Sequence, residues 1–255
     1  MKPVTRWLSD QQLAQIYTAE FWNDVAAEKK KDLWIGDGDY TRCMEYLASS
    51  GLLREYAQAE RFVREFAAGR PSPIVVADLA AGIGWTSASL SRLDEVSEVC
   101  AVEISEHRLD GLFEHAVKMM SGNETKLSRY LGSFYDLQFE DRSIDLVFLS
   151  QAFHHAENPF RLLTECDRVL RTGGRIIVTG EHFVSMQLVL RRIAAVLVRR
   201  HRLTTNFFEL FPPDPVLGDH YYRISDYYFL FGTLGYRLQH QRVGNSKCIY
   251  VADKK

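Results

Sequence analysis

The sequence predicts an α/β fold built on a doubly wound β-sheet of about seven strands, most of them parallel. Beyond residue 70, short apolar runs rich in β-branched residues alternate with helical sequence, as in strands joined by helical crossovers. The first of these runs leads through a glycine turn directly into a helix, at 74–90. The last two runs, 236–243 and 248–251, are separated by Gly244 and Asn245, which predicts an antiparallel hairpin that closes the sheet.

Helical sequence fills the part of the chain that precedes the sheet. Apolar residues recur at helical spacing over 9–31, and helical sequence continues over 40–68 with a break at Gly51. A proline-rich hinge at 70–73 then leads into the first strand. We therefore expect an N-terminal helical cap at 1–70 and a sheet-containing domain at 71–255.

Five parallel strands are predicted within this second domain. Because parallel strands joined by helical crossovers place their carboxyl ends on one edge of the sheet, the loops that follow them should converge there. The strands are expected at 74–78, 98–103, 127–132, 144–149 and 175–179, and the helices between them at 86–90, 106–120 and 158–170.

A helical and loop insertion is expected at about 183–234, and its first helix, at 184–203, is apolar but studded with arginines. The arginine pairs do not share one face, which favours a helix whose apolar side packs on the core while the arginines lie in solvent. The alternative is a face that binds a membrane surface or an anionic substrate. The arginines are Arg191, Arg192, Arg199, Arg200 and Arg202.

The glycine turn reads IVVADLAAGIGWTSASL, with Asp78 at the end of the strand and Gly82 and Gly84 before the helix. Glycines let the backbone approach a ligand closely, and the helix N-terminus offers unpaired N–H groups. Taken alone, the turn could also be a strand-to-helix connection without a ligand. The next strand ends in Glu103, where an acidic side chain accepts hydrogen bonds from ribose hydroxyls. The two features together indicate a nucleoside-binding site.

These motifs resemble those of class I S-adenosylmethionine-dependent methyltransferases, in the group that acts on small molecules. The resemblance also covers LGSFYDLQFEDRSIDLVFLSQAFHHAENPFRLLTECDRVLRTGGRIIVTGE, so that it spans about 73–181. It implies a Rossmann-like fold, S-adenosylmethionine as the cofactor and S-adenosylhomocysteine as its product. A nicotinamide dehydrogenase fits less well, because Ser87 stands where its GxGxxG motif needs glycine or alanine.

The same resemblance implies where the cofactor binds. Ala80 replaces the usual first glycine of the motif, and Ser133 stands where many members carry an aspartate that accepts from the adenine amino group. A serine hydroxyl can also accept that bond, while Gln151 could contact the methionine moiety through its amide. The cofactor-binding residues are expected to be Asp78, Ala80, Gly82, Gly84, Glu103, Ile104, Ser133, Phe134 and Gln151.

Methyl transfer from a sulfonium is an in-line displacement that needs no metal, so no metal site is expected. An oxygen acceptor also needs a base, and histidine suits that role at neutral pH. His154 and His155 directly follow the strand at 144–149, and His182 follows the strand at 175–179. These three histidines are the predicted catalytic candidates, with Glu181 and His220 as alternatives.

The amino-acid composition limits the kinds of binding partner and the cellular compartment that we expect. A net charge of −2 and a pI near 6.5 argue against a nucleic-acid partner, and no apolar run is long enough for stable membrane insertion. The four cysteines are isolated and predict buried thiols in a reducing cytoplasm. They are Cys43, Cys100, Cys166 and Cys248.

The expected function is methylation of a small-molecule acceptor, with a hydroxyl of a sugar or secondary metabolite as the expected target. Carbon or nitrogen methylation, and a module that binds S-adenosylmethionine without catalysis, are the alternatives. A macromolecular methyltransferase is disfavoured because the chain has no basic excess. The oligomeric state stays open, with a homodimer as one alternative.

Overall fold

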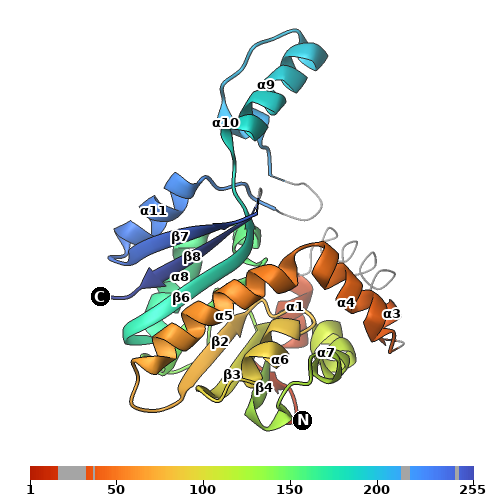
Figure 1. Ribbon diagram of the computed structural model, residues 1–255, viewed down its shortest axis with the longest axis vertical. Coiled ribbons are helices and arrows are strands. Elements are labelled where there is room, and N and C mark those ends of the chain that lie inside the picture. The colour runs from red at the N-terminus through yellow and green to blue at the C-terminus, as the bar shows by residue number, and fades with distance from the viewer. Residues whose placement is uncertain (17–32, 37, 214–218, 245–246) are drawn as a thin grey trace.

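Eight strands form one sheet in the computed structural model, which describes residues 1–16, 33–36, 38–213, 219–244 and 247–255 (Figure 1). Their order across the sheet is β1-β4-β3-β2-β5-β6-β8-β7. The strands are β1 (Thr5–Arg6), β2 (Ile74–Leu79), β3 (Val96–Glu103), β4 (Leu127–Leu131), β5 (Ile144–Ser150), β6 (Leu170–His182), β7 (Arg237–Val243) and β8 (Lys247–Asp253).

The sheet is parallel from β1 to β6, whereas β8 runs antiparallel to both β6 and β7. The predicted doubly wound, Rossmann-like sheet with a C-terminal antiparallel hairpin is therefore confirmed. The strand that was not predicted is β1, whose two residues pair with Tyr130 and Leu131 of β4. Two residues are too few to show the alternation by which a strand is predicted from sequence.

The strand order reverses at the centre of the sheet. From β2 the chain moves outward through β3 to β4, and it then returns to the other side of β2 to form β5. Ligands of open α/β sheets bind outside the carboxyl ends of the strands at such a switch point. The loops that follow β2 and β5 therefore occupy the position expected of a binding site.

Helices cover both faces because alternate side chains of each central strand point to opposite sides. Val76, Val99 and Phe148 belong to a core shared with α5, α6 and α7, while Ala77, Val147 and Leu149 belong to a second core shared with α8 and α11. Figure 1 shows these two layers around the sheet. The helices are α1 (Asp10–Ile16), α3 (Leu33–Gly36), α4 (Tyr40–Ser49), α5 (Leu52–Ala68), α6 (Trp85–Ser91), η1 (His107–Leu112), α7 (Phe113–Met120), η2 (Glu124–Lys126), η3 (Phe153–His155), α8 (Pro159–Val169), α9 (Met186–Arg200), α10 (Phe207–Leu210) and α11 (Ile224–Thr233).

Local signals fix several of these helices. Gly51 has φ = +80° and separates α4 from α5, as the sequence predicted. The side chain of Asn158 accepts from the backbone N–H of Arg161 and Pro159 stands in the first turn, so α8 begins where a cap and a proline favour it. The helix expected over 106–120 divides into a π-helical turn, η1, and α7. Of the helix expected over 9–31, the part beyond Ile16 lies outside the described residues.

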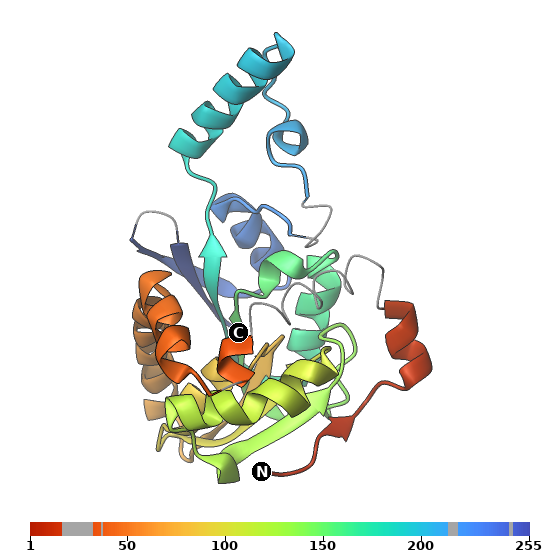
Figure 2. The same ribbon diagram turned by 90° about the vertical axis from the view of Figure 1, so that its right-hand side faces the viewer.

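The insertion after β6 forms an arm, which we define as residues 183–213. Figures 1 and 2 show α9 and α10 projecting away from the sheet and its helices. No residue of α9 is buried, and Arg192 packs over the ring of Phe211 at 5.6 Å. The interpretation that α9 packs its apolar side on the core is therefore wrong. Helical periodicity shows that a helix has an apolar face, but it does not show what that face covers.

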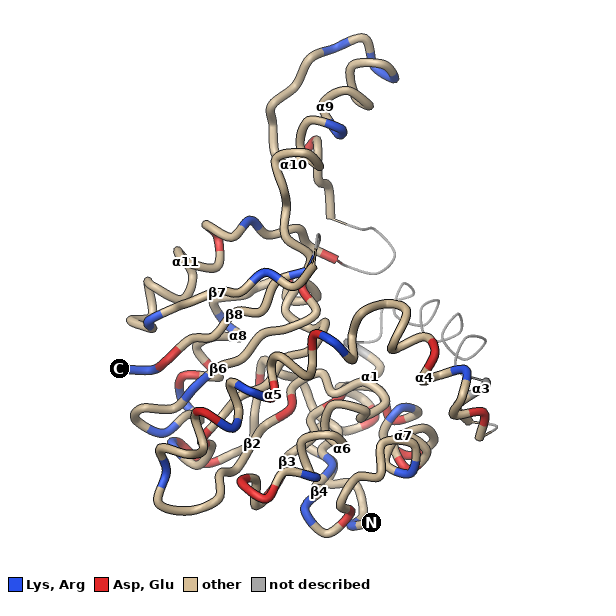
Figure 3. The backbone as a smooth tube through the Cα atoms, in the orientation of Figure 1, with Lys and Arg blue, Asp and Glu red and all other residues tan. Residues whose placement is uncertain are grey.

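The arm is basic, with five arginines and Glu209 as its one acidic residue (Figure 3). Elsewhere, the prediction that the four cysteines are buried thiols is confirmed. Within the described residues, no helix combines the length and the apolar character needed to cross a membrane.

Candidate functional site

A cavity of about 300 Å³ lies at the carboxyl edge of the sheet, where the loops after β2 and β5 meet. Its size is at the lower end of the range for small-molecule sites. The wall opposite the sheet comes from α3, α4 and α5, so the N-terminal helices help to enclose it. The lining residues are Ile35, Cys43, Tyr46, Leu47, Leu52, Ala80, Ala81, Gly82, Ile83, Trp85, Thr86, Arg108, Ser150, Gln151 and His155.

The loop after β2 depends on three residues with positive φ. Ala80, Gly82 and Gly84 have φ angles of +52°, +58° and +85°. An added Cβ at Gly82 would meet no atom within 4 Å, so the backbone there borders open space, whereas an added Cβ at Gly84 would lie 2.2 Å from the ring of Phe113. Ala80 adopts a conformation that suits glycine better, at a cost of roughly 1–2 kcal/mol.

Glu103, at the end of β3, ties this loop to the sheet. Its carboxylate is buried and accepts from three backbone N–H groups, those of Gly82 at 2.8 Å, Ile104 at 3.0 Å and Ser105 at 2.9 Å. A carboxylate has about four acceptor positions. One position therefore remains for a ligand hydroxyl, beside the open space at Gly82.

Asp78 lies beneath the loop and is not part of the cavity lining. Its Oδ2 atom accepts from the hydroxyls of Thr86, at 2.7 Å, and Ser87, at 2.6 Å, so it holds the first turn of α6. Its Oδ1 atom is buried and has no hydrogen bond within the described part of the chain. Burial raises the pKa of the Asp78 carboxyl to about 6, although the hydroxyls of Ser87 and Thr86 act to lower it.

Ser133 and Phe134 follow β4 and lie outside the cavity lining. Ser133 Oγ accepts from the backbone N–H of Tyr135 at 3.2 Å, and the ring of Phe134 packs edge-on against the ring of Tyr135, with the ring centroids 4.6 Å apart. The predicted cofactor residues therefore fall into three groups. Ala80, Gly82 and Gln151 line the cavity, Asp78, Gly84, Glu103 and Ile104 support its loop, and Ser133 and Phe134 lie farther along the same edge.

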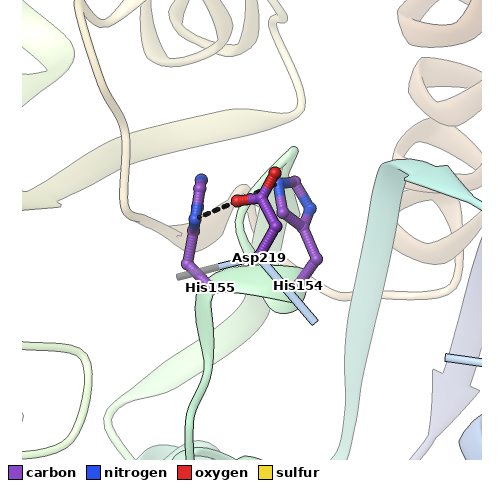
Figure 4. Close-up of side chains that lie close together, drawn as sticks. All are labelled: His154, His155 and Asp219. Atoms are coloured by element: carbon purple, nitrogen blue, oxygen red, sulfur yellow. Dashed lines mark ion pairs between the residues drawn. The ribbon is translucent and has the colours of Figure 1, made fainter. Parts of the chain in front are cut away.

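Two of the three candidate histidines, His154 and His155, lie together beside Asp219 (Figure 4). His155 also lines the cavity, and its Nδ1 atom lies 3.0 Å from Asp219 Oδ1. The Nδ1 atom of His154 lies 2.9 Å from Glu181 Oε2, and its Nε2 atom lies 3.8 Å from the same oxygen of Asp219. His182 is exposed at the end of β6, opposite Lys247, and belongs to neither the cluster nor the lining.

The histidines and carboxylates of this cluster stabilise one another's charged forms. Burial alone would lower the pKa of His154, but the carboxylates of Glu181 and Asp219 outweigh it, so that the pKa is raised. Burial alone would raise the pKa of Asp219, but the adjacent imidazole of His155, together with the charges of His154 and His220, lowers it. The cluster is therefore suited to hold positive charge at the edge of the cavity.

The central part of the chain matches a known protein family. Residues 77–178 match the family model described as a methyltransferase domain. The solved S-adenosylmethionine-dependent methyltransferases of Aquifex aeolicus and Mesorhizobium loti share the fold, with TM-scores of 0.53 and 0.54 at 16% identity, covering 76% and 75% of this chain and 88% and 96% of theirs. Residues 77–178 thus form a methyltransferase domain. This match and the shared fold imply S-adenosylmethionine as the cofactor, as the sequence predicted.

Curated relatives of the methyltransferase domain act on different acceptors. A malonyl-[acyl-carrier protein] O-methyltransferase of Methylococcus capsulatus is 29% identical over 150 residues, which are 59% of this chain and 52% of that protein. A demethylmenaquinone methyltransferase of Clavibacter sepedonicus is 33% identical over 103 residues, 40% of this chain and 39% of that protein. The chain spans about half the length of the first of these relatives.

The residues of the methyltransferase domain fit the cofactor. Glu103 retains an acceptor position for a ribose hydroxyl, Gly82 leaves room for a ligand against the backbone, and Gln151 presents an amide to the same cavity. Bound S-adenosylmethionine supplies an activated methyl group on a positively charged sulfur. The chain would bind and orient it at the switch point between β2 and β5.

Several residues of the site were not predicted from the sequence. Asp219 lies 64 positions beyond His155. The N-terminal helices were expected as a cap, but the particular residues with which α3, α4 and α5 line the cavity were not. Glu181 was considered as an alternative base, but it is the buried partner of His154 Nδ1 and also accepts from the backbone N–H of Phe153 at 3.1 Å. The nearest sequence signal for Asp219 was His220, its neighbour.

Replacing Glu103 by alanine is expected to weaken S-adenosylmethionine binding by about 1–3 kcal/mol, because the ribose acceptor and the support of the Gly82 loop are both lost. Isothermal titration with S-adenosylmethionine and S-adenosylhomocysteine measures the change. Glu106→Ala is the control, because that carboxylate is exposed and pairs with Arg6. Equal affinity of the Glu103 variant and the wild type would contradict the assignment.

The buried carboxyl of Asp78 is expected to make stability depend on pH. Its pKa rises from its ordinary value of 3.8 to about 6 in the fold, which corresponds to about 3 kcal/mol. Below pH 3.8 the carboxyl is protonated in both the folded and the unfolded protein, and the preference of the fold for the protonated carboxyl then stabilises the protein fully. This stabilisation is lost as the pH rises through 6. Asp78→Asn should therefore gain stability relative to the wild type between pH 4 and 7. Urea unfolding at several pH values measures this, and a constant difference between the two proteins would contradict it.

Proposed function

We propose that this chain is a methyltransferase that transfers the methyl group of S-adenosylmethionine to a hydroxyl of a small molecule. The observation that carries the proposal is the cluster of His154, His155 and Asp219 beside the cavity, with His155 in its wall. An oxygen nucleophile must lose a proton, and this cluster offers imidazole nitrogens backed by carboxylates at that position. The relatives' acceptors differ, so the choice of oxygen rests on the cluster.

In this mechanism the chain positions the methyl donor and the acceptor, and it removes a proton from the acceptor. A lone pair of the acceptor oxygen attacks the methyl carbon as the carbon–sulfur bond breaks, and the bond electrons pass to sulfur to give S-adenosylhomocysteine. The proton of the acceptor passes to the histidine cluster. The loop around Gly82 and the amide of Gln151 orient the methyl donor, while α3, α4 and α5 exclude water from one side.

Three further observations support a small acceptor in this proposal. The cavity is walled on the side of the N-terminal helices, which suits a small molecule better than a polymer. A net charge of −2 does not favour nucleic acid. We retain the division into a helical cap at 1–70 and a methyltransferase domain at 71–255, a cytoplasmic location and a sugar or secondary-metabolite acceptor as parts of the proposal.

Isothermal titration with S-adenosylmethionine, S-adenosylhomocysteine and NAD tests the cofactor first. We expect micromolar binding of the first two and none of NAD. A screen of small hydroxyl, amine and carbon acceptors with methyl-labelled S-adenosylmethionine then tests the reaction, with labelled hydroxyl products expected. Transfer to amines alone, or binding without transfer to any acceptor class, would replace this proposal by an N-methyltransferase or by a module that binds the cofactor without catalysis.

A further inference from the structure

The cluster beside the cavity has the composition of a metal site. His154, His155 and Asp219 each offer one ligand atom, and these atoms lie within 4.8 Å of one another (Figure 4). Two imidazoles and one carboxylate are a ligand set used by Zn²⁺ and by other divalent transition metals in sites that keep positions open for a substrate. No sequence pattern predicts this ligand set, because Asp219 lies far along the chain from the two histidines.

Glu181 orients one ligand. Its carboxylate cannot donate when ionised, so the 2.9 Å contact places the proton of His154 on Nδ1 and leaves the lone pair on Nε2. Nε2 is the atom on the side of Asp219, 3.8 Å from its Oδ1. A histidine that donates to a carboxylate through one nitrogen and offers the other to a cation is the usual arrangement around protein-bound metals.

Asp219 is the ligand with the least satisfied environment. Its Oδ1 atom is buried and makes no hydrogen bond of acceptable angle within the described ranges, although it lies 3.0 Å from His155 Nδ1. With both imidazoles neutral, Asp219 and Glu181 bring two negative charges to the cluster. The positive charge of Lys247 does not balance these two charges alone, because its ammonium also lies 3.9 Å from the carboxylate of Glu55. A dication would satisfy the oxygen and balance the two charges.

The backbone holds the three ligands in place before any ion binds. The backbone N–H of His220 donates to the carbonyl of His154 at 2.8 Å, and the hydroxyl of Tyr222 donates to the carbonyl of Ala156 at 3.0 Å. These bonds fasten the segment that carries Asp219 to the segment that carries both histidines. A preformed ligand set reduces the ordering that metal binding would otherwise require.

We propose that His154 Nε2, His155 Nδ1 and Asp219 Oδ1 bind one divalent transition metal ion of the Zn²⁺ class, with open coordination positions facing the cavity. The ion serves the acceptor, since S-adenosylmethionine needs no metal for its own reactivity. This part rests on the proposed function. A hydroxyl bound to the ion would lose its proton more readily. In the metal-bound site the lone pairs of both imidazoles hold the ion, so this proton would pass to solvent and not to the histidines. An acceptor with two adjacent oxygens, such as a vicinal diol or a hydroxy acid, would bind through both.

Metal binding can be measured without an acceptor. The full-length protein is dialysed against a chelator and titrated with Co²⁺, whose visible spectrum reports its ligands, and with Zn²⁺ by calorimetry. We expect one ion per chain. Asp219→Asn and His155→Ala should each weaken binding by at least tenfold, and Glu181→Gln, which acts through His154, should weaken it by about 10–100-fold. His201→Ala, at the end of α9, is the matched control and should bind as the wild type does.

Measurements on the same protein distinguish the proposed metal site from the proposed methyltransferase function. S-adenosylmethionine binding is measured on the metal-free protein, and thermal unfolding confirms that each variant is folded. Cofactor binding without Co²⁺ or Zn²⁺ binding would overturn the metal site and leave the methyltransferase proposal intact. One ion per chain that is lost in Asp219→Asn, without cofactor binding, would support the site and refute the function. Equal metal affinity in the wild type and in both Asp219→Asn and His155→Ala would also overturn the site.

Discussion

Replacing Gly84 by alanine is expected to cost about 2–5 kcal/mol of unfolding free energy. Gly84 has φ = +85°, a conformation that costs a residue with a Cβ about 1–2 kcal/mol. The added methyl group would also lie 2.2 Å from the ring of Phe113, and overpacking of a core costs typically 1–3 kcal/mol. Urea unfolding measures the loss. Because Gly84 precedes the first turn of α6, S-adenosylmethionine binding should weaken as well.

Gly82 and Phe113 supply the controls for this experiment. Gly82→Ala has the same unfavourable sign of φ but meets no atom within 4 Å, so its cost should stay near 1–2 kcal/mol. Phe113→Leu replaces the ring by a smaller side chain. Combined with Gly84→Ala, it should recover part of the lost unfolding free energy, as a double-mutant cycle would show. If Gly84→Ala costs no more than Gly82→Ala, the close approach of Phe113 does not constrain this turn.

Replacing His154 or His155 by alanine is expected to slow methyl transfer by about 10²–10⁴-fold, the usual contribution of a group that handles a proton in the transition state. The affinity for S-adenosylmethionine should change little, because the loop around Gly82 and Glu103 is untouched. Single-turnover rates with the acceptor found by screening, together with titration of the cofactor, separate the two effects.

His182 is the informative comparison for that prediction. The sequence placed it among the catalytic candidates, but it lies at the exposed end of β6, opposite Lys247 and outside the cavity lining. We expect His182→Ala to keep nearly the wild-type rate. A loss equal to that of His155→Ala would mean that the acceptor binds on a different side of β6 from the one proposed.

The sequence predicts what its local patterns determine. The β-branched run of β2, the glycine turn and the acid at the end of β3 are contiguous signals, and the structure places Gly82 and Glu103 in direct contact. The sheet follows from the same kind of signal, because parallel strands buried on both faces read as continuous apolar runs. Gln151 and His155 both line the cavity, and the sequence singles them out because they follow a predicted strand.

Contacts between distant segments leave no such local signal. Asp219 joins His155 because the segment beyond the arm is fastened back by the bond from His220 to His154. A loop aspartate has no periodicity that shows its partner, so the cluster could not be predicted. Ser133 likewise follows β4, and the hydrogen bond that its hydroxyl accepts from the backbone N–H of Tyr135 has no sequence signal.

The arm has a consequence for how the molecule opens. A helix of 15 residues without a buried side chain is stabilised mainly by its own hydrogen bonds, and such helices are marginal in water. Its backbone amides should therefore exchange with solvent deuterium through local opening, whereas the amides of β2 and β5 should exchange only through global unfolding. We therefore expect α9 to open independently of the sheet, and substitutions in α9 to leave the unfolding midpoint of the sheet almost unchanged.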